Sequence, residues 1–387
     1  MEPQSIQSLP RAVDAGHSAA HRYLESLLAE ADIRLDGQRP WDMRLRRTGV
    51  AERILAQGSL GLGESYMDGG WDCDHLDQFF DRLLRANLPS RVRPWAMAWH
   101  HLRARWCNLQ TEDRAWEVGS AHYDLGNDFY AAMLDRRMTY TCAFWQGAET
   151  LDAAQEHKLD LVCRKLGLAP GMRVLDIGCG WGSFMQFAAE RYGVQCVGVT
   201  ISAEQAALGQ QRCAGLPIEF RLADYRTLSE RFDRIVSIGM FEHVGHKNYA
   251  TYMDVAQRCL ADDGLFLLHT IGRNEHGHGT DPWMHRYIFP NGELPTIAQM
   301  GRAAERRFVV EDLHSFGADY DRTLMAWHHN FAQAWPRFAG QLDERFRRMW
   351  RYYLLCCAGA FRARDIQAWQ WVLSKPGRPG VYPRLAA

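Results

Sequence analysis

The spacing of apolar residues changes once along the chain, from a helical period to short apolar runs. In the first part, residues 12–33 repeat apolar side chains at helical spacing, until Asp36-Gly37 ends the pattern. A second helical stretch follows Asp74, which we expect to cap it, and carries the apolar residues Leu76, Phe79, Phe80, Leu83 and Leu84. We interpret this part as a small helical and mixed module.

From Leu151 onward, apolar runs of strand length alternate with stretches of helical character. The runs lie near residues 173–177, 195–200, 217–222, 233–238 and 264–270. Two later runs, near residues 308–313 and 368–374, would complete a sheet of seven strands. Strands that alternate with helices form parallel sheets, because the chain crosses over between them. The pattern therefore predicts an α/β fold with a doubly wound, mostly parallel seven-stranded sheet.

Composition narrows the class of protein. A chain of 387 residues is long enough for two domains, and its formal net charge of −1 does not suggest nucleic-acid binding. The 10 cysteines lack paired metal-type spacing, which indicates a reducing cytoplasm without a disulfide framework. We predict no signal peptide, and no apolar run reaches the roughly 18 residues that span a bilayer. We therefore expect a cytoplasmic protein without a metal site.

Two stretches of the first part are candidates for lipid contact. Residues 59–71 interleave glycines with Leu, Tyr, Met and Trp, and we expect a shaped loop lined by apolar side chains. Residues 91–106 predict a helix with one aromatic stripe and flanking arginines: Trp95, Trp99, Leu102 and Trp106, with Arg91, Arg103 and Arg105. Such a face suits an anionic membrane surface, but it would also suit packing between two domains.

The stretch Arg173-Val-Leu-Asp-Ile-Gly-Cys-Gly-Trp-Gly182 is the most informative decapeptide. An apolar strand enters a turn made of Gly178, Cys179, Gly180 and Gly182, where the backbone can approach a ligand before a helix begins near Ser183. The third glycine comes one residue too early for a dinucleotide fingerprint, and the next strand lacks a terminal acid. Asp176 can instead accept from the ammonium group of S-adenosylmethionine (SAM). The pattern resembles the first motif of class I SAM-dependent methyltransferases, although a tight turn that binds nothing is the alternative.

Ligands of open α/β sheets lie beyond the carboxyl ends of the strands, so the residues there are site candidates. Thr200 and Gln205 could bond the ribose of SAM, while Ser202 could do so or merely cap the next helix. Asp224, Tyr225 and Arg226 could hold the adenine. The next two strand ends contribute three further candidates, Glu242, His269 and the backbone of Ile271.

Several motifs, in order along almost the whole chain, resemble the cyclopropane-fatty-acyl-phospholipid synthase family. Besides the SAM turn, they are Gly61-Leu-Gly-Glu-Ser-Tyr-Met-Asp-Gly69, His122-Tyr-Asp-Leu-Gly-Asn-Asp128, Tyr140-Thr-Cys-Ala-Phe-Trp145, Val197-Gly-Val-Thr-Ile-Ser202, Met240-Phe-Glu-His-Val-Gly245, Phe316-Gly-Ala-Asp-Tyr-Asp321 and Phe361-Arg-Ala-Arg-Asp-Ile-Gln367. The resemblance implies transfer of a SAM methyl carbon to the cis double bond of an acyl chain in a phospholipid, followed by deprotonation and ring closure. It also implies a bound bicarbonate as the base, contact with the inner membrane surface, and a homodimer.

The family's site residues carry over onto positions of this chain. The resemblance places Cys142, Glu242, His269, the Ile271 main chain and Tyr320 around the bicarbonate, and Tyr140 and Thr141 against SAM. It gives Cys357 a nucleophilic role, which the chemistry does not require, and the adjacent Cys356 favours simple packing instead. Cys142, His269 and Tyr320 could equally be ordinary core residues. Glu242 is harder to explain as structural, because a carboxylate after an apolar strand needs a partner.

The domain organisation that follows is an N-terminal lipid-contacting domain at residues 1–105, a linker at 106–120 and a catalytic domain at 121–387. A basic cluster of Arg345, Arg347, Arg348 and Arg351 would touch phospholipid headgroups or form a solvated helix face. Three rival functions remain: lipid methylation without ring closure, methylation of a small-molecule amine, and lipid binding without turnover. The N-terminal domain argues against the second, and Asp176 with Glu242 argues against the third.

Overall fold

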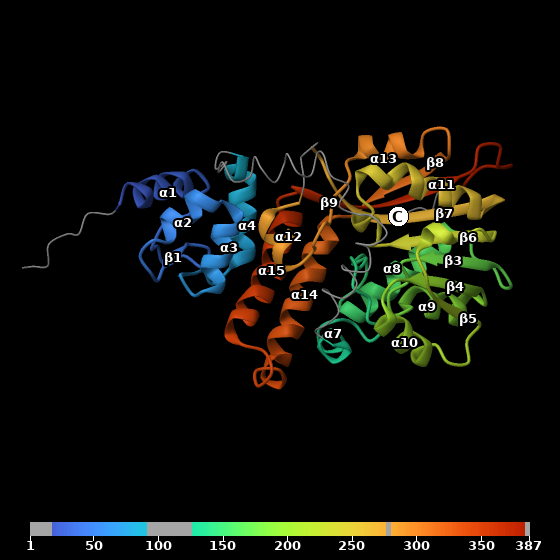
Figure 1. Ribbon diagram of the computed structural model, residues 1–387, viewed down its shortest axis with the longest axis horizontal. Helices are drawn as coiled ribbons and strands as arrows, with labels where there is room; N and C mark the ends of the chain where they lie inside the picture. The colour runs from blue at the N-terminus through green and yellow to red at the C-terminus, as the bar shows by residue number, and fades with distance from the viewer. Residues whose placement is uncertain (1–17, 91–125, 276–279, 384–387) are drawn as a thin grey trace, which may run out of the picture.

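The computed structural model describes residues 18–90, 126–275 and 280–383 (Figure 1). Helices α1–α4 lie at one end of the molecule, a seven-stranded sheet lies at the other, and helices α14 and α15 lie between them. The aromatic stripe at residues 91–106 and the predicted domain boundary both fall outside the described residues. Within these residues, no helix is both long and apolar enough to cross a bilayer.

The sheet confirms the predicted strands and their mostly parallel arrangement. Its order is β5-β4-β3-β6-β7-β9-β8. The strands are β3 Arg173–Ile177, β4 Gln195–Thr200, β5 Ile218–Leu222, β6 Phe232–Ile238, β7 Leu260–Arg273, β8 Val309–Ser315 and β9 Ile366–Ser374. β9 runs antiparallel to both of its neighbours, and every other pair is parallel. The carboxyl ends of β3, β4, β5, β6 and β7 consequently share one edge.

Helices cover both faces of the sheet, as a doubly wound fold requires. On one face, Val174 packs with residues of α8 Leu151–Lys165 and α9 Ser183–Tyr192. On the other, Leu175 and Ile177 pack with α11 Tyr249–Cys259 and α13 Ile297–Ala304. Neighbouring strand residues point to opposite faces, so the apolar run of β3 serves both layers. Helix α10 Ala203–Arg212 lies against Phe220 of β5, which packs with the cluster of the α8 and α9 face.

The N-terminal module is mostly helical, with α1 Ala19–Glu30, α2 Val50–Gln57, α3 Ser59–Met67 and α4 Leu76–Arg85, and a two-stranded ladder of β1 Arg44–Leu45 and β2 Trp71–Asp72. The expected cap at Asp74 is wrong: His75 precedes α4, makes no side-chain cap, and Asp74 pairs with Arg44 instead. The expected apolar loop at residues 59–71 is also wrong, since most of it is α3.

The glycines of α3 explain why this helix forms despite its composition. A Cβ atom at Gly61 would lie 2.4 Å from the carbonyl oxygen of Arg53, and one at Gly63 would lie 2.3 Å from Cδ1 of Trp283. Trp283 belongs to α12 Pro282–Tyr287 and is fully buried. Close packing of α3 against α2 and α12 therefore outweighs the low helix propensity of glycine, which is about 1 kcal/mol per residue.

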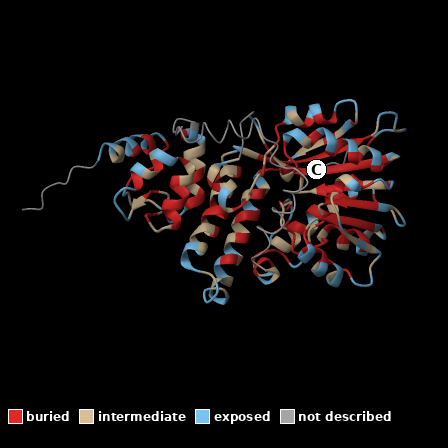
Figure 2. Cartoon of the chain, in the orientation of Figure 1, coloured by how far each residue is buried: buried red, intermediate tan, exposed pale blue. Residues whose placement is uncertain are grey.

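One hydrophobic cluster joins the N-terminal module to helices α7 Asn127–Met133, α14 Ala318–Ala334 and α15 Glu344–Arg362. It contains Phe79 from α4, Trp327 from α14 and Leu354 from α15, all buried. Figure 2 shows that burial continues from the sheet strands into these central helices. The module and the sheet-bearing part are therefore packed against a common core.

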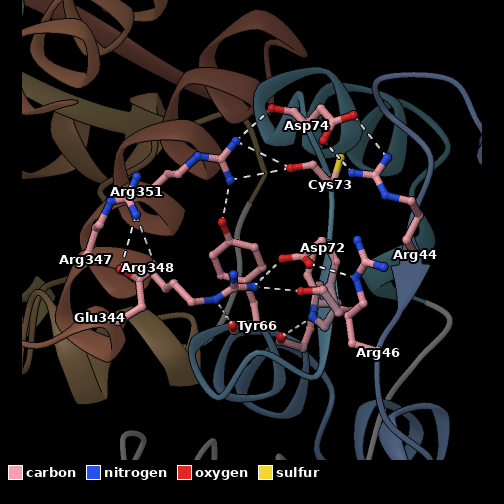
Figure 3. A network of polar contacts seen from close by, with 12 residues as sticks. Arg44, Arg46, Tyr66, Asp72, Cys73, Asp74, Glu344, Arg347, Arg348 and Arg351 are labelled. Carbon is pink, nitrogen blue, oxygen red and sulfur yellow. Dashed lines mark hydrogen bonds and ion pairs between the residues drawn. The ribbon is translucent and has the colours of Figure 1, made fainter. Parts of the chain in front are cut away.

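Polar contacts of α15 reinforce this junction (Figure 3). Arg348 donates to the carbonyl oxygens of Tyr66 and Trp71 and to Asp72, and its guanidinium lies 4.0 Å from the ring of Tyr66. Arg351 donates to the Tyr66 hydroxyl and to the Asp74 carbonyl oxygen. Arg345 pairs with Asp68. These three arginines of the basic cluster therefore bind the N-terminal module, whereas Arg347 pairs with Glu344 of its own helix and lies over the ring of Trp335.

Candidate active site

The glycine turn after β3 has the geometry that the sequence predicts. The backbone N–H groups of Gly178 and Cys179 both donate to the carbonyl oxygen of Val199 at the end of β4, at 2.9 and 3.1 Å. Gly178 adopts φ +88°, and a Cβ atom there would lie 2.6 Å from Cγ of Met240. Gly182 is left-handed and directly precedes α9, while Gly180 faces open space. The turn therefore brings backbone to the shared carboxyl edge, packed against Met240 at Gly178 and open at Gly180.

Asp176 lies just before this turn and is unusual among the carboxylates. It is 3% exposed and accepts no hydrogen bond from any described residue. Burial raises the pKa of its carboxyl to about 7, and the positive charge of Lys158 opposes that rise. A buried carboxylate without donors needs a partner. The side chain can therefore receive a cation such as an ammonium group.

The candidates after β4 bond to one another. The hydroxyl of Ser202 accepts from the backbone N–H of Gln205 at 3.3 Å, so Ser202 caps α10 as the capping alternative predicts. Thr200 Oγ1 accepts from the N–H of Ser202 and donates to Oε1 of Gln205 at 3.3 Å. All three residues are buried. They form a connected polar group beside the turn.

The candidates after β5 form a second polar group, at η2 Tyr225–Thr227. The carboxylate of Asp224 accepts from the Arg226 guanidinium at 2.9 and 2.7 Å. Tyr225 is buried, and its ring meets that of Tyr252 edge to face. Asp224 therefore pairs with Arg226 and holds it beside the ring of Tyr225. The three residues form one connected group instead of three separate contacts for a nucleoside.

Glu242 lies in η3 Phe241–His243, directly after β6. Its Oε1 accepts from the backbone N–H of Ile271 at 2.6 Å, so this peptide group orients the carboxylate. Its Oε2 is buried and finds no partner among the described residues. Burial raises the pKa of Glu242 to about 7. The unpaired oxygen is positioned to accept a hydrogen bond from a ligand.

His269 lies on β7 and is fully buried. Burial, followed by the charges of Lys158, Lys165 and His314, lowers its pKa well below the usual value, so the ring is neutral. Nδ1 of His269 lies 3.4 Å from Nε2 of Gln370 on the neighbouring strand β9. The ring also meets Phe316 edge to face. Phe316 comes four residues before Tyr320, which places His269 toward the same region.

Tyr320 marks the point where the catalytic candidates meet. It lies in the first turn of α14, and its ring stacks on Phe361 of α15 with 4.5 Å between centroids. Burial raises its pKa well above the usual value, and the charges of Cys142, Glu242 and Cys357 raise it further, so all three groups lie near the phenol. Cys142 is itself fully buried with a raised pKa. The structure therefore brings these candidates together, with neutral thiol and phenol groups around Glu242.

Tyr140 and Thr141 connect the two halves of the site. The hydroxyl of Tyr140 lies 2.8 Å from that of Tyr353 on α15. Thr141 adjoins the end of β6, because a Cβ atom at Gly239 would lie 2.5 Å from its Cγ2. Met240, which follows, is the side chain that faces Gly178. The SAM turn, the end of β6 and the segment with Thr141 are therefore neighbours.

Sequence reasoning missed three buried polar residues of this region, Gln155, Lys158 and Gln370. Lys158 is 0% exposed, and its Nζ donates to Oγ1 of Thr141 at 2.9 Å. The missed signal was spacing: Lys158 stands four residues from Ala154 and from Val162, on the apolar face of α8. Gln370 likewise interrupts the apolar strand β9. A polar residue on an apolar face indicates a buried partner.

Comparisons with known proteins show the family of the chain. Residues 110–371 match the family model described as mycolic acid cyclopropane synthetase. The cyclopropane-fatty-acyl-phospholipid synthase of Escherichia coli K12 is 53% identical over 368 residues, which are 93% of this chain and 95% of that protein. A probable fatty acid methyltransferase of Pseudomonas putida is 40% identical over 68% of this chain and 70% of its own length.

Solved structures give the same result. The cyclopropane synthase MmaA2 from Mycobacterium tuberculosis is 35% identical with a TM-score of 0.64, over 70% of this chain and 100% of that one. The mycolic acid cyclopropane synthase CmaA1 complexed with SAH and CTAB is 37% identical with a TM-score of 0.63, over 67% of this chain and 98% of that one. The chain therefore belongs to the cyclopropane synthase family of SAM-dependent methyltransferases.

Proposed function

We propose that this protein transfers the methyl carbon of SAM to the cis double bond of an unsaturated acyl chain in a membrane phospholipid, and that a deprotonation then closes a cyclopropane ring. One observation carries the proposal: Glu242 is buried at the carboxyl edge of the sheet, with one oxygen held by Ile271 and the other without a partner in the part of the chain that the structure describes. The Escherichia coli relative, whose name specifies a fatty-acyl phospholipid, supports the choice of substrate.

SAM supplies an electrophilic methyl group. In this proposal Asp176 receives its ammonium group, because the carboxylate is buried and lacks a donor among the described residues. In the turn at Gly178–Gly182 the backbone faces open space at Gly180, and we assign Tyr140 and Thr141 to the same ligand. Thr200 and Gln205 are the partners of the ribose. Tyr225 and Arg226 are those of the adenine, with Arg226 already oriented by Asp224.

The groups around Glu242 fit a small anion such as bicarbonate. Burial keeps the Cys142 thiol and the Tyr320 phenol protonated and the His269 ring neutral, because it raises the first two pKa values and lowers the third. The phenol and the imidazole can each donate one hydrogen bond, and Oε2 of Glu242 can accept the proton of the ion. The Cys142 thiol donates to the carbonyl oxygen of Ala143 at 3.3 Å and would have to turn from it to donate to the ion. When bound, bicarbonate would supply the base for the transferred methyl group.

The burial of the same groups suits chemistry on an alkene. A double bond is a weak nucleophile, so reaction depends on holding it close to the methyl donor, and positioning can supply several kcal/mol of the barrier reduction. The cation formed on the chain reacts with water unless water is excluded. Cys142, His269 and Tyr320 are all buried, which supports a dry site. Cys357 lies on α15, near Tyr320 of α14, and we assign Cys357 a packing role.

We further propose that the protein acts as a peripheral membrane protein and as a homodimer. A phospholipid substrate requires contact with a bilayer surface, and the aromatic stripe Trp95, Trp99, Leu102 and Trp106 supplies residue types that suit one. The homodimer rests on the family resemblance. Analytical ultracentrifugation with and without unsaturated vesicles tests both points.

The proposed activity is tested by incubating the purified protein with SAM and vesicles of a cis-unsaturated phosphatidylglycerol. Cyclopropyl protons should appear in the proton NMR spectrum of the extracted lipid, and the rate should fall in carbonate-free buffer and recover with added bicarbonate. Signals of a methyl or methylene branch without cyclopropyl protons would favour methylation without ring closure. Indifference of the rate to carbonate would refute the proposed base.

A further inference from the structure

Helix α8 carries a lysine in a place where a charge is costly. Lys158 is 0% exposed, and its ammonium donates one hydrogen bond among the described residues, to Oγ1 of Thr141 at 2.9 Å. A methionine of similar length would fill the same volume without a desolvation penalty of several kcal/mol. Packing alone therefore does not explain a lysine at this position.

The segment that Lys158 contacts has no regular secondary structure of its own. Residues 139–142 lie outside any helix or strand. Nε2 of Gln155, one helical turn before Lys158, donates to the carbonyl oxygens of Thr139 and Thr141 at 3.3 and 2.8 Å. The carboxylate of Asp135 accepts from the backbone N–H of Thr139 at 2.7 Å. Buried polar groups on and beside α8 thus hold this segment in place.

We propose that Lys158 is a positioning residue for the methyl donor: it fixes the Tyr140–Cys142 segment through Thr141 and supplies the positive charge against which Asp176 stays ionised. The inference rests on the proposed binding of the SAM ammonium group by Asp176. Lys158 would thus act on two parts of the site: the segment with Cys142, and the Asp176 carboxylate before the glycine turn.

The charges around Lys158 support this assignment. The groups that act on it are Asp135 after α7, Cys142 in the segment and Asp176 on β3, and it acts in turn on His269 of β7. Within the described residues, Lys158 is the one charged group that lowers the pKa of Asp176. Burial lowers the pKa of Lys158 to about 8, while that of Asp176 is about 7. Both groups are therefore charged in the interval between these values.

The sign of the pH effect follows. SAM binding needs the ionised form of Asp176, which is lost as the pH falls through about 7. Removing the charge of Lys158 removes what opposes the burial of that carboxylate, so the pKa of Asp176 rises further. We expect the midpoint of SAM affinity against pH to move upward by about one unit, which is a roughly tenfold weaker affinity below the midpoint.

The experiment measures SAM affinity by calorimetry from pH 6 to 9 in the full chain, with SAM as the probe. Lys158→Met removes both the charge and the hydrogen bond, and Lys158→Gln removes the charge but retains a donor. Both should show the upward shift of the midpoint. Thr141→Val should weaken binding without moving the midpoint. Circular dichroism melts should show that both Lys158 variants are folded at the temperature of the binding measurement.

Lys165→Met is the matched control. Lys165 is a second buried lysine of the same helix, and it pairs with Asp312 at 3.1 Å. Its loss should lower stability, because it leaves the Asp312 carboxylate buried, and the pH midpoint of SAM binding should stay unchanged.

Two outcomes overturn the inference in distinguishable ways. An unshifted midpoint in Lys158→Gln, together with loss of SAM binding in Asp176→Ala, would leave the proposed SAM site intact and refute the role of Lys158. Normal SAM binding by Asp176→Ala would refute the placement of SAM on which the inference rests. If Lys158→Met does not fold, the shift in Lys158→Gln decides the question alone.

Discussion

Single side chains at the edge of the sheet combine two properties that rarely occur together, deep burial and an unpaired acceptor. Asp176 and Glu242 both have a pKa of about 7 because they are buried. A carboxylate retained in such a place lowers stability unless a ligand completes it. At the residue scale, the two buried carboxylates therefore need a ligand to satisfy them.

Replacement of Glu242 by Gln keeps the shape of the side chain but places a donor where one carboxylate oxygen accepts. We expect SAM binding to be retained and turnover to fall by at least about a hundredfold, the scale of losing positioned acid or base catalysis. Single-turnover assays with added bicarbonate should show partial recovery. Recovery at no bicarbonate concentration would indicate that Glu242 is itself the base.

The raised pKa of Asp176 predicts opposite pH trends for stability and for SAM binding. The unfolded carboxyl ionises near its usual value of 3.8 and the folded one near 7, so this group stabilises the fold fully at low pH and progressively less as the pH rises to about 7. Asp176→Asn should flatten that part of the profile. Urea unfolding between pH 4.5 and 8 measures it, and identical slopes in both proteins would contradict the expectation.

At the scale of elements, the composition of helices α3 and α15 does not reveal what these helices pack against. The glycines of α3 permit contact with Trp283, and we expect Gly63→Ala to destabilise the protein by about 1–3 kcal/mol, as overpacking of a core does. Gly301→Ala is the control, because Gly301 lies in α13 with open space around it. That variant should gain up to about 1 kcal/mol. Equal effects in urea unfolding would mean that helix propensity, not packing, governs α3.

Helix α15 docks the N-terminal module through its arginines. Arg348→Ala would remove a charged donor from the carbonyl oxygens of Tyr66 and Trp71 and from the Asp72 carboxylate, and we expect a loss of about 2–4 kcal/mol. Arg347→Ala, one residue away, removes a more exposed pair with Glu344 and should change stability by less than about 0.5 kcal/mol. Limited proteolysis should cleave the first variant faster. The two variants behaving alike would show that the hydrophobic cluster alone holds the module.

At the scale of the whole molecule, the N-terminal module, α15 and the sheet form a continuous body around the catalytic candidates. Tyr353, Cys357 and Phe361 belong to the same helix as the docking arginines, and they contact or face Tyr140 and Tyr320. The helix that holds the module therefore also lines the site.

Membrane contact is a property of the whole molecule as well. We expect replacement of Trp99 and Trp106 by Ala to weaken sedimentation with anionic vesicles while SAM binding remains, because indole rings anchor at headgroup depth. Unchanged sedimentation with a lower melting temperature would indicate that the stripe packs inside the protein.

The sequence by itself determined the sheet and its turn. Strands β3 to β6 lie within one residue of their predicted ranges, and the turn at Gly178–Gly182 forms as expected. These features depend on local causes: apolar runs, helix caps and the freedom of glycine at positive φ. The extent of β7 was less well determined: it starts four residues before its predicted range, where Leu260 pairs with Phe232 of β6, and its end is extended by pairing with β9 up to Arg273.

Only the tertiary structure decided what the polar residues do. Local pattern suggested a loop at residues 59–71, a cap at Asp74 and free arginines on α15. In the structure, most of the loop is helix α3, Asp74 does not cap α4, and an arginine of α15 binds the N-terminal module. Lys158 and Gln370 interrupt apolar patterns, which indicates buried partners but does not identify them. A charge or amide acquires its role from the groups that surround it after folding, and no spacing within one segment specifies them.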